Sequence, residues 1–190
     1  MAEFGPESWV EVTRPHGEVA ALLAVQSALA DRPGVLPAAR AMSHFGEHSI
    51  GWLAVSAAGA LAQPRRLRPW LLAGAGTLAA HAVAVAIKRV VRRERPQHPA
   101  VAVGVGTPSR LSFPSAHATS TTAAAILIGR AAGLTGPALL ALPALLVPPM
   151  ALSRMVLGVH YPSDVLTGIA VGAAVAGAVI RLDSGGGADE

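Results

Sequence analysis

The sequence predicts an all-α integral membrane protein with about five transmembrane helices and an additional N-terminal amphipathic helix. Hydrophobic residues make up 52% of the 190-residue chain, and its mean hydropathy of +0.49 is well above that of soluble proteins. Long apolar runs alternate with short arginine-rich segments, as expected when helices cross a bilayer and their charged loops stay in water. The apolar residues are mostly Ala, Leu, Val and Gly, so the helices can pack closely through small side chains.

The charge balance points to anionic lipid headgroups and phosphate as partners. The formal net charge is +4 and comes from fourteen Arg and a single Lys. Few aromatic residues interleave with these cations and no nucleic-acid motif is visible, so no nucleic-acid partner is expected. The absence of cysteine excludes disulfides and thiolate metal sites. The N-terminus lacks the charged start and apolar core of a cleaved signal, so insertion would use the spans themselves.

Residues 1–44 are predicted to be a polar N-terminal segment followed by an interfacial amphipathic helix. The helix covers residues 17–31, where apolar residues fall on one face at helical spacing, interrupted by Gln26. This stretch is too short to span a bilayer comfortably. The alternative placement, packed on the bundle, is equally compatible with the pattern. A Pro-Gly pair at 33–34 and Pro37 then break the chain.

Residues 45–182 are predicted to be the transmembrane catalytic domain, and residues 183–190 a disordered tail. Prolines or arginine-rich turns separate the apolar runs. The predicted spans are 45–63, 69–91, 114–132, 137–157 and 162–182.

Counting crossings brings three polar clusters to the same membrane face. The cluster 88–96 (KRVVRRERP) follows the second span, 114–117 (PSAH) opens the third, and 153–164 (SRMVLGVHYPSD) joins the fourth and fifth. Random placement of polar clusters would not require this agreement. The sequence therefore predicts one composite site.

The composition of these clusters indicates phosphate chemistry. A helix that starts near Pro114 leaves the backbone N–H groups of Ser115, Ala116 and His117 free to bind an anion, and its dipole adds positive potential. If the helix of the second span continues, Lys88 and Arg95 share one face. Together with a third cation, Arg154, these side chains could clamp phosphate oxygens.

His160 is the predicted nucleophile. No cysteine is present, and no cluster of carboxylates is available to hold a metal that would activate water, so no cofactor is expected. Asp164, one helical turn after His160, can reach one ring nitrogen and leave the other free to attack. His117 lies close enough to give a proton to the leaving group.

Three patterns resemble the signature motifs of the type 2 phosphatidic acid phosphatase (PAP2) superfamily. They are Lys88-x6-Arg95-Pro96, Pro114-Ser115-x-His117 and Ser153-Arg154-x5-His160-x3-Asp164, in the family's order and internal spacing. The resemblance implies a metal-independent lipid phosphatase in which His160 forms a phosphohistidine, Asp164 orients it and His117 protonates the leaving group. It also assigns phosphate binding to Lys88, Arg95, Ser115 and Arg154.

Two features refine this resemblance. Ala116 stands where the family usually has Gly, so the extra methyl group is expected to tune specificity while its N–H still binds phosphate. The short length, the Ala- and Arg-rich composition and the single Lys resemble bacterial members that act on polyprenyl-linked substrates such as decaprenylphosphoryl-5-phosphoribose. A phosphotransferase that uses the same phosphohistidine, and a non-enzymatic lipid transporter or assembly subunit, are the competing hypotheses.

Several residues are left without a firm role. His44 and His48 are spaced like two metal ligands, but no third ligand is identifiable, and His98 could contact substrate. His81 lies in the middle of a span, and Ser163 is expected to cap the last one.

The arginine count between spans favours a plasma-membrane protein with its site on the external face, provided that the positive charges of the site are set aside as functional. A homo-oligomer is compatible with the sequence.

Overall fold

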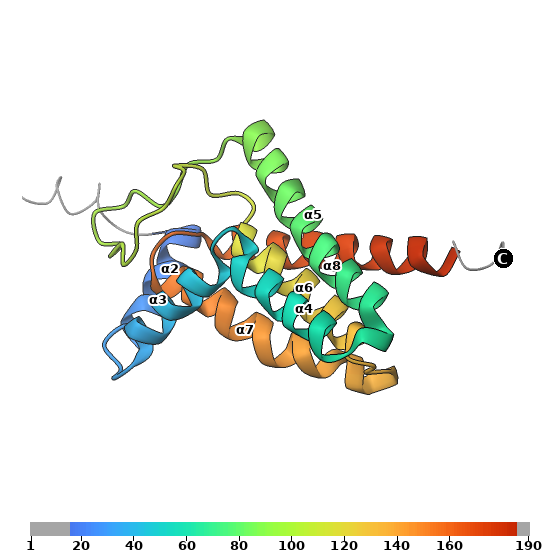
Figure 1. Cartoon of the computed structure of the whole chain (residues 1–190). Coiled ribbons are helices and arrows are strands. Elements are labelled where there is room, and N and C mark those ends of the chain that lie inside the picture. Colours follow the sequence, from blue (N-terminus) through green and yellow to red (C-terminus); the bar gives the residue numbers. More distant parts are fainter. Residues whose placement is uncertain (1–15, 186–190) are drawn as a thin grey trace, which may run out of the picture.

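The computed structural model describes residues 16–185, which form a bundle of helices (Figure 1). No strand occurs in this part of the chain, where an isolated bridge joins Glu94 and Leu111. The expectations for residues 1–15 and 186–190 lie outside the described residues. The helices are α2 (Gly17–Leu29), α3 (Val35–Gly46), η1 (Glu47–Ser49), α4 (Ile50–Ala62), η2 (Pro64–Arg66), α5 (Leu67–Val91), α6 (Ala116–Ala131), η3 (Gly136–Leu140), α7 (Ala141–Val156) and α8 (Pro162–Gly185).

Helix α6 is the centre of the bundle and packs against α4, α5, α7 and α8. Nearly all of its side chains are buried, and most are Ala, Ser or Thr. The hydroxyl groups of Thr119 and Thr122 donate to backbone oxygens four residues earlier, so they are satisfied within the helix. These small side chains allow the close helix packing that the composition predicts.

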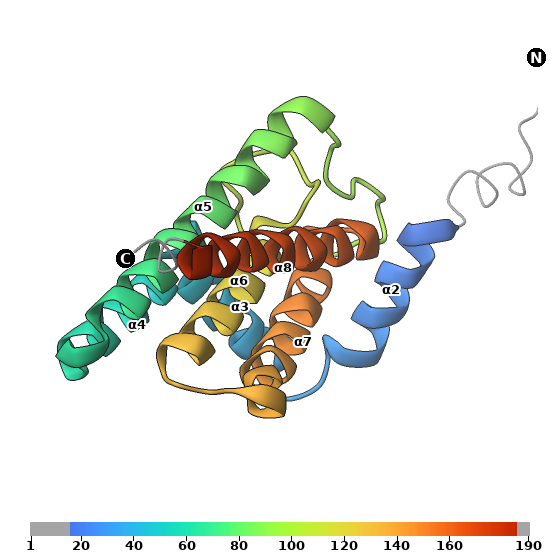
Figure 2. The same ribbon diagram turned by 90° about the vertical axis from the view of Figure 1, so that its right-hand side faces the viewer.

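Helix α8 approaches α6 most closely at two glycines (Figure 2). A side chain at Gly168 would meet the backbone oxygen of Ser115, and one at Gly172 would meet that of Thr119. The two backbones therefore lie in contact without intervening side chains. Where α6 and α8 begin, the backbone N–H of Ser115 donates to the carbonyl oxygen of Asp164 at 2.9 Å.

The outer surface of the bundle is apolar, as expected for helices that face lipid. Among the described helices, three are long and apolar enough to cross a membrane, namely 64–91, 136–156 and 162–185. The predicted all-α membrane fold is confirmed, whereas the count of five crossings stays a prediction because α4 and α6 have only 13 and 16 residues. Large exposed apolar side chains include Leu61, Leu71, Leu78, Val90, Leu145, Leu166 and Leu182.

The region before α4 differs from the sequence prediction. Helix α3 is not predicted from the sequence. Pro37 does not prevent it, because this proline lies in the first turn, where no backbone N–H is needed for an intrahelical bond. The predicted first span, 45–63, is interrupted by η1, so α4 starts only at Ile50. His48 and Ser49 have positive φ angles of 48° and 64° at this break.

Helix α2 packs on the bundle, which is one of the two placements that the sequence leaves open. Gln26, which interrupts its apolar pattern, is the buried contact: its amide donates to the carbonyl oxygens of Ala102 at 2.7 Å and Val156 at 3.0 Å. The position of α2 relative to a membrane surface stays a prediction.

The two ends of the bundle carry different sets of polar residues. At one end Asp183 of α8 pairs with Arg68 of α5 at 3.0 Å and with Arg130 of α6 at 3.9 Å. At the other end lie the end of α5, the start of α6 and the α7–α8 junction, covered by the 24-residue segment between Val91 and Ala116. The alternation of helix direction therefore brings the three polar clusters together, as the crossing count predicts.

Candidate active site

A cavity of about 410 Å³ lies where the three clusters meet. Of the predicted site residues, Ser115 and Asp164 are fully buried behind its wall. The others line the cavity itself: Lys88, Arg95, Ala116, His117, Arg154 and His160.

Lys88 lies in the last turn of α5 and is only 8% exposed. Its ammonium group donates to the carbonyl oxygens of Leu111 at 3.2 Å and Ser112 at 2.8 Å. An ammonium group has three N–H donors, so these two carbonyls leave one for an anion in the cavity.

Arg95 reaches the cavity from the loop rather than from a helix. Helix α5 ends at Val91 because Arg92 adopts the left-handed conformation, with φ 54°. The prediction that Lys88 and Arg95 share a helix face is therefore wrong, although both line the cavity. Arg95 is held by donation to the carbonyl oxygens of Ser109 and Val159, at 2.8 and 2.7 Å. Burial lowers the pKa of Arg95 to about 10, and Asp164 opposes the shift, so the guanidinium is charged at neutral pH.

Arg154 is the most deeply buried cation of the site, with 1% exposure. Both terminal nitrogens donate to the hydroxyl oxygen of Ser43, at 3.1 and 3.2 Å. Its Nε has no hydrogen-bond partner among the described residues. A buried donor without an acceptor is costly, and a phosphate oxygen at this place would satisfy it.

The start of α6, where the sequence predicts an anion site, differs from the prediction in one respect. Ser115 is the N-cap and accepts a hydrogen bond from the Ala118 N–H at 3.4 Å, so Pro114 precedes the helix instead of occupying its first turn. Because the Ser115 N–H donates to Asp164, it cannot bind phosphate. The N–H groups of Ala116 and His117 lie in the first turn, where no intrahelical acceptor exists.

His117 lies at the cavity wall against α3. Its Nε2 is 2.9 Å from the backbone oxygen of Ser43. A carbonyl oxygen can only accept, so Nε2 carries a proton in this arrangement. Ser43 therefore contacts both Arg154 and His117, and it lies two residues before the predicted start of the catalytic domain at residue 45.

The contacts of His160 define its tautomer. Its Nε2 lies 3.2 Å from Arg95 Nη1, and because a guanidinium only donates, Nε2 must accept. The ring proton is then on Nδ1, which lies 3.5 Å from Asp164 Oδ2, a contact that can shorten when substrate binds. Burial, reinforced by Arg95, Lys88 and Arg154, lowers the pKa of His160 well below its ordinary value. The imidazole is therefore neutral at pH 7, and in this arrangement its Nε2 lone pair accepts from Arg95.

Asp164 is positioned by a network that the sequence analysis misses. Arg93 Nη1 donates to Asp164 Oδ1 at 3.0 Å and to Ser163 Oγ at 2.7 Å, while Nη2 pairs with Glu18 Oε2 at 2.5 Å. The guanidinium also lies 4.0 Å from the ring centre of Tyr161. Burial would raise the pKa of Glu18, but hydrogen bonds from Ser163 and Arg93 outweigh it and keep the pKa below its ordinary value.

The second oxygen of Asp164 caps its own helix. Oδ2 accepts a hydrogen bond from the backbone N–H of Tyr161 at 2.8 Å, the return half of a capping box. Ser163 donates its backbone N–H to Glu18 at 2.9 Å and accepts from Arg93 through its hydroxyl. Both carboxylate oxygens of Asp164 are thus held in place.

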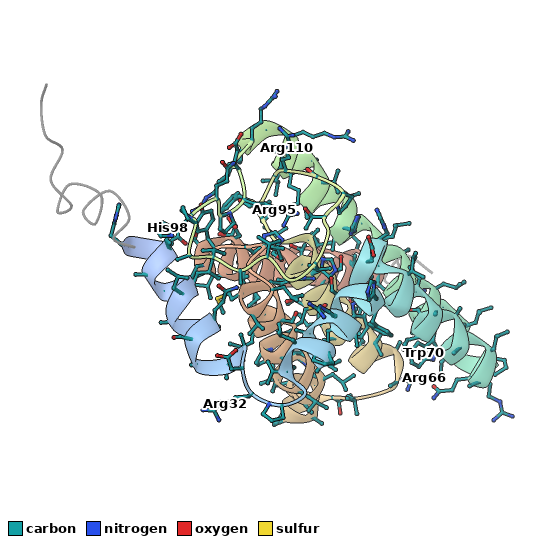
Figure 3. The ribbon with its side chains drawn as sticks, turned by 90° about the vertical axis from the view of Figure 1, so that its left-hand side faces the viewer. Arg32, Arg66, Trp70, Arg95, His98 and Arg110 are labelled. Carbon is teal, nitrogen blue, oxygen red and sulfur yellow. The ribbon has the colours of Figure 1, made fainter. Side chains whose placement is uncertain are left out.

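The other histidines divide into two groups. His98 does not line the cavity, and its Nδ1 accepts from the Ala100 N–H at 3.2 Å. His44 does not line the cavity and 74% of its side chain is exposed, whereas His48 and His81 line it. Between residues 16 and 185 no group of three His, Cys, Asp or Glu side chains could hold a metal ion. Figure 3 shows the loop arginines Arg95 and Arg110 at the opposite end of the molecule from Arg66.

The chain is similar to two mycobacterial proteins named decaprenylphosphoryl-5-phosphoribose phosphatase. The protein from Mycobacterium tuberculosis is 66% identical over 172 residues, covering 90% of this chain and 93% of the relative. The protein from Mycolicibacterium smegmatis is 70% identical over 154 residues, covering 81% and 82%.

Two solved structures share the fold. The crystal structure of Aquifex aeolicus LpxE has a TM-score of 0.68 at 17% identity and covers 90% of this chain and 98% of that one. The transmembrane PAP2 type phosphatidylglycerolphosphate phosphatase from Bacillus subtilis has a TM-score of 0.68 at 20% identity and covers 94% and 92%. The family model of the PAP2 superfamily matches residues 69–185. All three motifs lie within this match, and the chain belongs to the PAP2 superfamily.

Proposed function

We propose that the protein removes the terminal phosphate of decaprenylphosphoryl-5-phosphoribose, leaving the lipid-linked ribose and inorganic phosphate. The names of relatives that are 66–70% identical over most of both chains support this substrate. The observation that carries the reaction is the cavity itself, where His160 faces three cations, Lys88, Arg95 and Arg154. The unsatisfied Nε of buried Arg154 fits a phosphate oxygen.

The reaction has two steps. In the first, His160 Nε2 attacks phosphorus, the bond from phosphorus to the sugar oxygen breaks, and doubly protonated His117 gives its Nδ1 proton to that oxygen while its Nε2 proton stays hydrogen-bonded to the Ser43 carbonyl oxygen. In the second, water attacks the phosphohistidine, His117 takes one of its protons, and phosphate leaves. The three cations stabilise the charge on the phosphoryl oxygens in both steps. Asp164 holds the Nδ1 proton and stabilises the positive charge that develops on the ring.

Phosphate release by the purified protein in mixed micelles tests this function. We expect the highest kcat/KM for decaprenylphosphoryl-5-phosphoribose when it is compared with polyprenyl phosphate, phosphatidic acid and phosphatidylglycerophosphate. A chelator should leave the rate unchanged, because no step uses a metal. No release from the ribosyl substrate, or release only after an acceptor alcohol is added, would contradict the proposal.

We further propose that the site opens on the external face of the plasma membrane. The opposite end carries Arg65, Arg66, Arg68 and Arg181, which the positive-inside rule assigns to the cytoplasm. The chain has no cysteine, so single-cysteine variants can be labelled cleanly. With a membrane-impermeant maleimide, Ala100→Cys should react in intact cells and Arg65→Cys only after lysis. The reverse pattern would place the site in the cytoplasm.

A further inference from the structure

Among the polar residues that line the cavity without a part in the two steps above are Glu47, His48 and His81. We call these three residues the inner polar pocket. They come from outside the three motifs, two from η1 and one from α5. His81 precedes Lys88 by seven residues, so it lies about 10 Å further along α5, toward the middle of the helix. A polar side chain near the middle of a membrane-spanning helix needs a hydrogen-bond partner, and in membrane proteins it commonly marks a functional site.

Two residues of the inner polar pocket lie at a strained break in the backbone, in η1. His48 has φ 48° and ψ 23°, and Ser49 has φ 64° and ψ 10°. Consecutive non-glycine residues in the left-handed region are uncommon, and they persist where the surrounding structure holds them. Here the break between α3 and α4 buries Ser49 completely while Glu47 and His48 stay on the cavity wall.

A chain of hydrogen bonds orients His81. Ser49 Oγ donates to Ser120 Oγ at 2.8 Å, and Ser120 Oγ lies 3.4 Å from His81 Nδ1. When Ser120 donates its proton to His81 Nδ1, the ring proton of His81 lies on Nε2 and provides an N–H donor. The His48 ring lies beside it, with 6.0 Å between ring centres.

The inner polar pocket adjoins His117, the proposed acid for the leaving group. Gly46, which directly precedes Glu47, packs on the His117 ring so closely that a Cβ there would lie 2.8 Å from Cδ2. Ser120, the partner of His81, lies one turn after His117 on α6. The group whose oxygen receives the proton from His117 must therefore lie next to the pocket.

We propose that the inner polar pocket binds the hydroxyl groups of the sugar that carries the phosphate. A carboxylate accepts and an imidazole N–H donates, and a sugar hydroxyl needs both kinds of partner. The negative charge of Glu47 disfavours a second anionic group at this position, and an apolar group would offer no hydrogen bond to the carboxylate or to the imidazoles. The inference rests on the proposed function, because it takes a lipid-linked pentose phosphate as substrate.

The test compares the ribosyl substrate with its analogue that lacks the hydroxyl groups at C2 and C3. In the unmodified protein we expect kcat/KM to be about 10-fold higher for the ribosyl substrate, the effect of one or two net hydrogen bonds to side chains that are only partly buried. His81→Leu and His48→Gly should reduce this ratio toward 1. His48→Gly removes the ring at a backbone conformation that glycine adopts freely, so it is expected to fold normally.

His98→Ala is the matched control, since this histidine lies outside the cavity lining, and it should keep the full ratio. The inference is overturned if the unmodified protein turns over both compounds equally, or if both variants keep the ratio. Failure of the unmodified protein to release phosphate from the ribosyl substrate would instead contradict the proposed function. The two failures are therefore distinguishable.

Discussion

Replacing His160 by alanine is expected to lower phosphate release by about 10⁴-fold or more, the scale on which loss of a nucleophile acts. The reason is that the contact with Arg95 places the unprotonated His160 Nε2 among the three cations, whereas His117, the other motif histidine of the cavity, has its Nε2 proton bonded to Ser43. Phosphate release under substrate saturation measures the effect. Size-exclusion elution and the melting temperature establish whether the variant is folded.

The control for this variant is His44→Ala, because that side chain is 74% exposed and does not line the cavity. It should release phosphate at the rate of the unmodified protein. Turnover within tenfold of the unmodified rate in folded His160→Ala would mean that another group, or water, attacks phosphorus.

Replacing Asp164 by asparagine is expected to lower kcat by about 10²- to 10⁴-fold with little change in KM. The carboxylate lies 3.5 Å from His160 Nδ1 and accepts from Arg93 and the Tyr161 N–H. An amide can turn its NH₂ group toward His160 Nδ1, which moves the ring proton to Nε2 and removes the attacking lone pair. Since Asp164 does not line the cavity, substrate binding should be nearly unaffected. Steady-state kinetics on the purified variant separates the two parameters.

Asp183→Asn offers a matched change at the far end of the same helix, where Asp183 pairs with Arg68. It removes an equal charge from α8 and should leave kcat unchanged. Equal losses in the two variants would indicate a general effect of charge on the helix. An unchanged kcat in Asp164→Asn would exclude the orienting role.

The fold follows from the sequence where one physical effect dominates. The long apolar runs and the many small residues suffice to predict α5, α7 and α8, and a tightly packed bundle. Helix α3 is missed because Gly34 and Pro37 resemble breakers when only local patterns are considered. A proline in the first turn removes no hydrogen bond, and Gly34 at φ 82° serves as the N-cap.

The site residues, too, can be predicted only where a local pattern determines their positions. Residues within one motif are predictable because their spacing is set by a single helix or turn, as for His160 and Asp164. Ser43 and Glu18 contact the site across 111 and 75 residues of sequence, so no local spacing indicates them. Arg93 stands inside a basic cluster, where composition alone favours a lipid headgroup contact over its pairing with Asp164.

The contact between α6 and α8 at Gly168 and Gly172 has a consequence for how the catalytic distances are maintained. The backbone N–H groups proposed to bind phosphate lie in the first turn of α6, and the carboxylate proposed to orient His160 lies in the first turn of α8. The hydrogen bond from the Ser115 N–H to the Asp164 carbonyl oxygen joins the two backbones. Gly172 lies eight residues, or about 12 Å, from Asp164 along the helix. A direct backbone contact between α6 and α8, buried in the bundle, therefore holds the two halves of the site together. The distance between them is set by the main chain and not by side-chain rotamers or by the surrounding lipid.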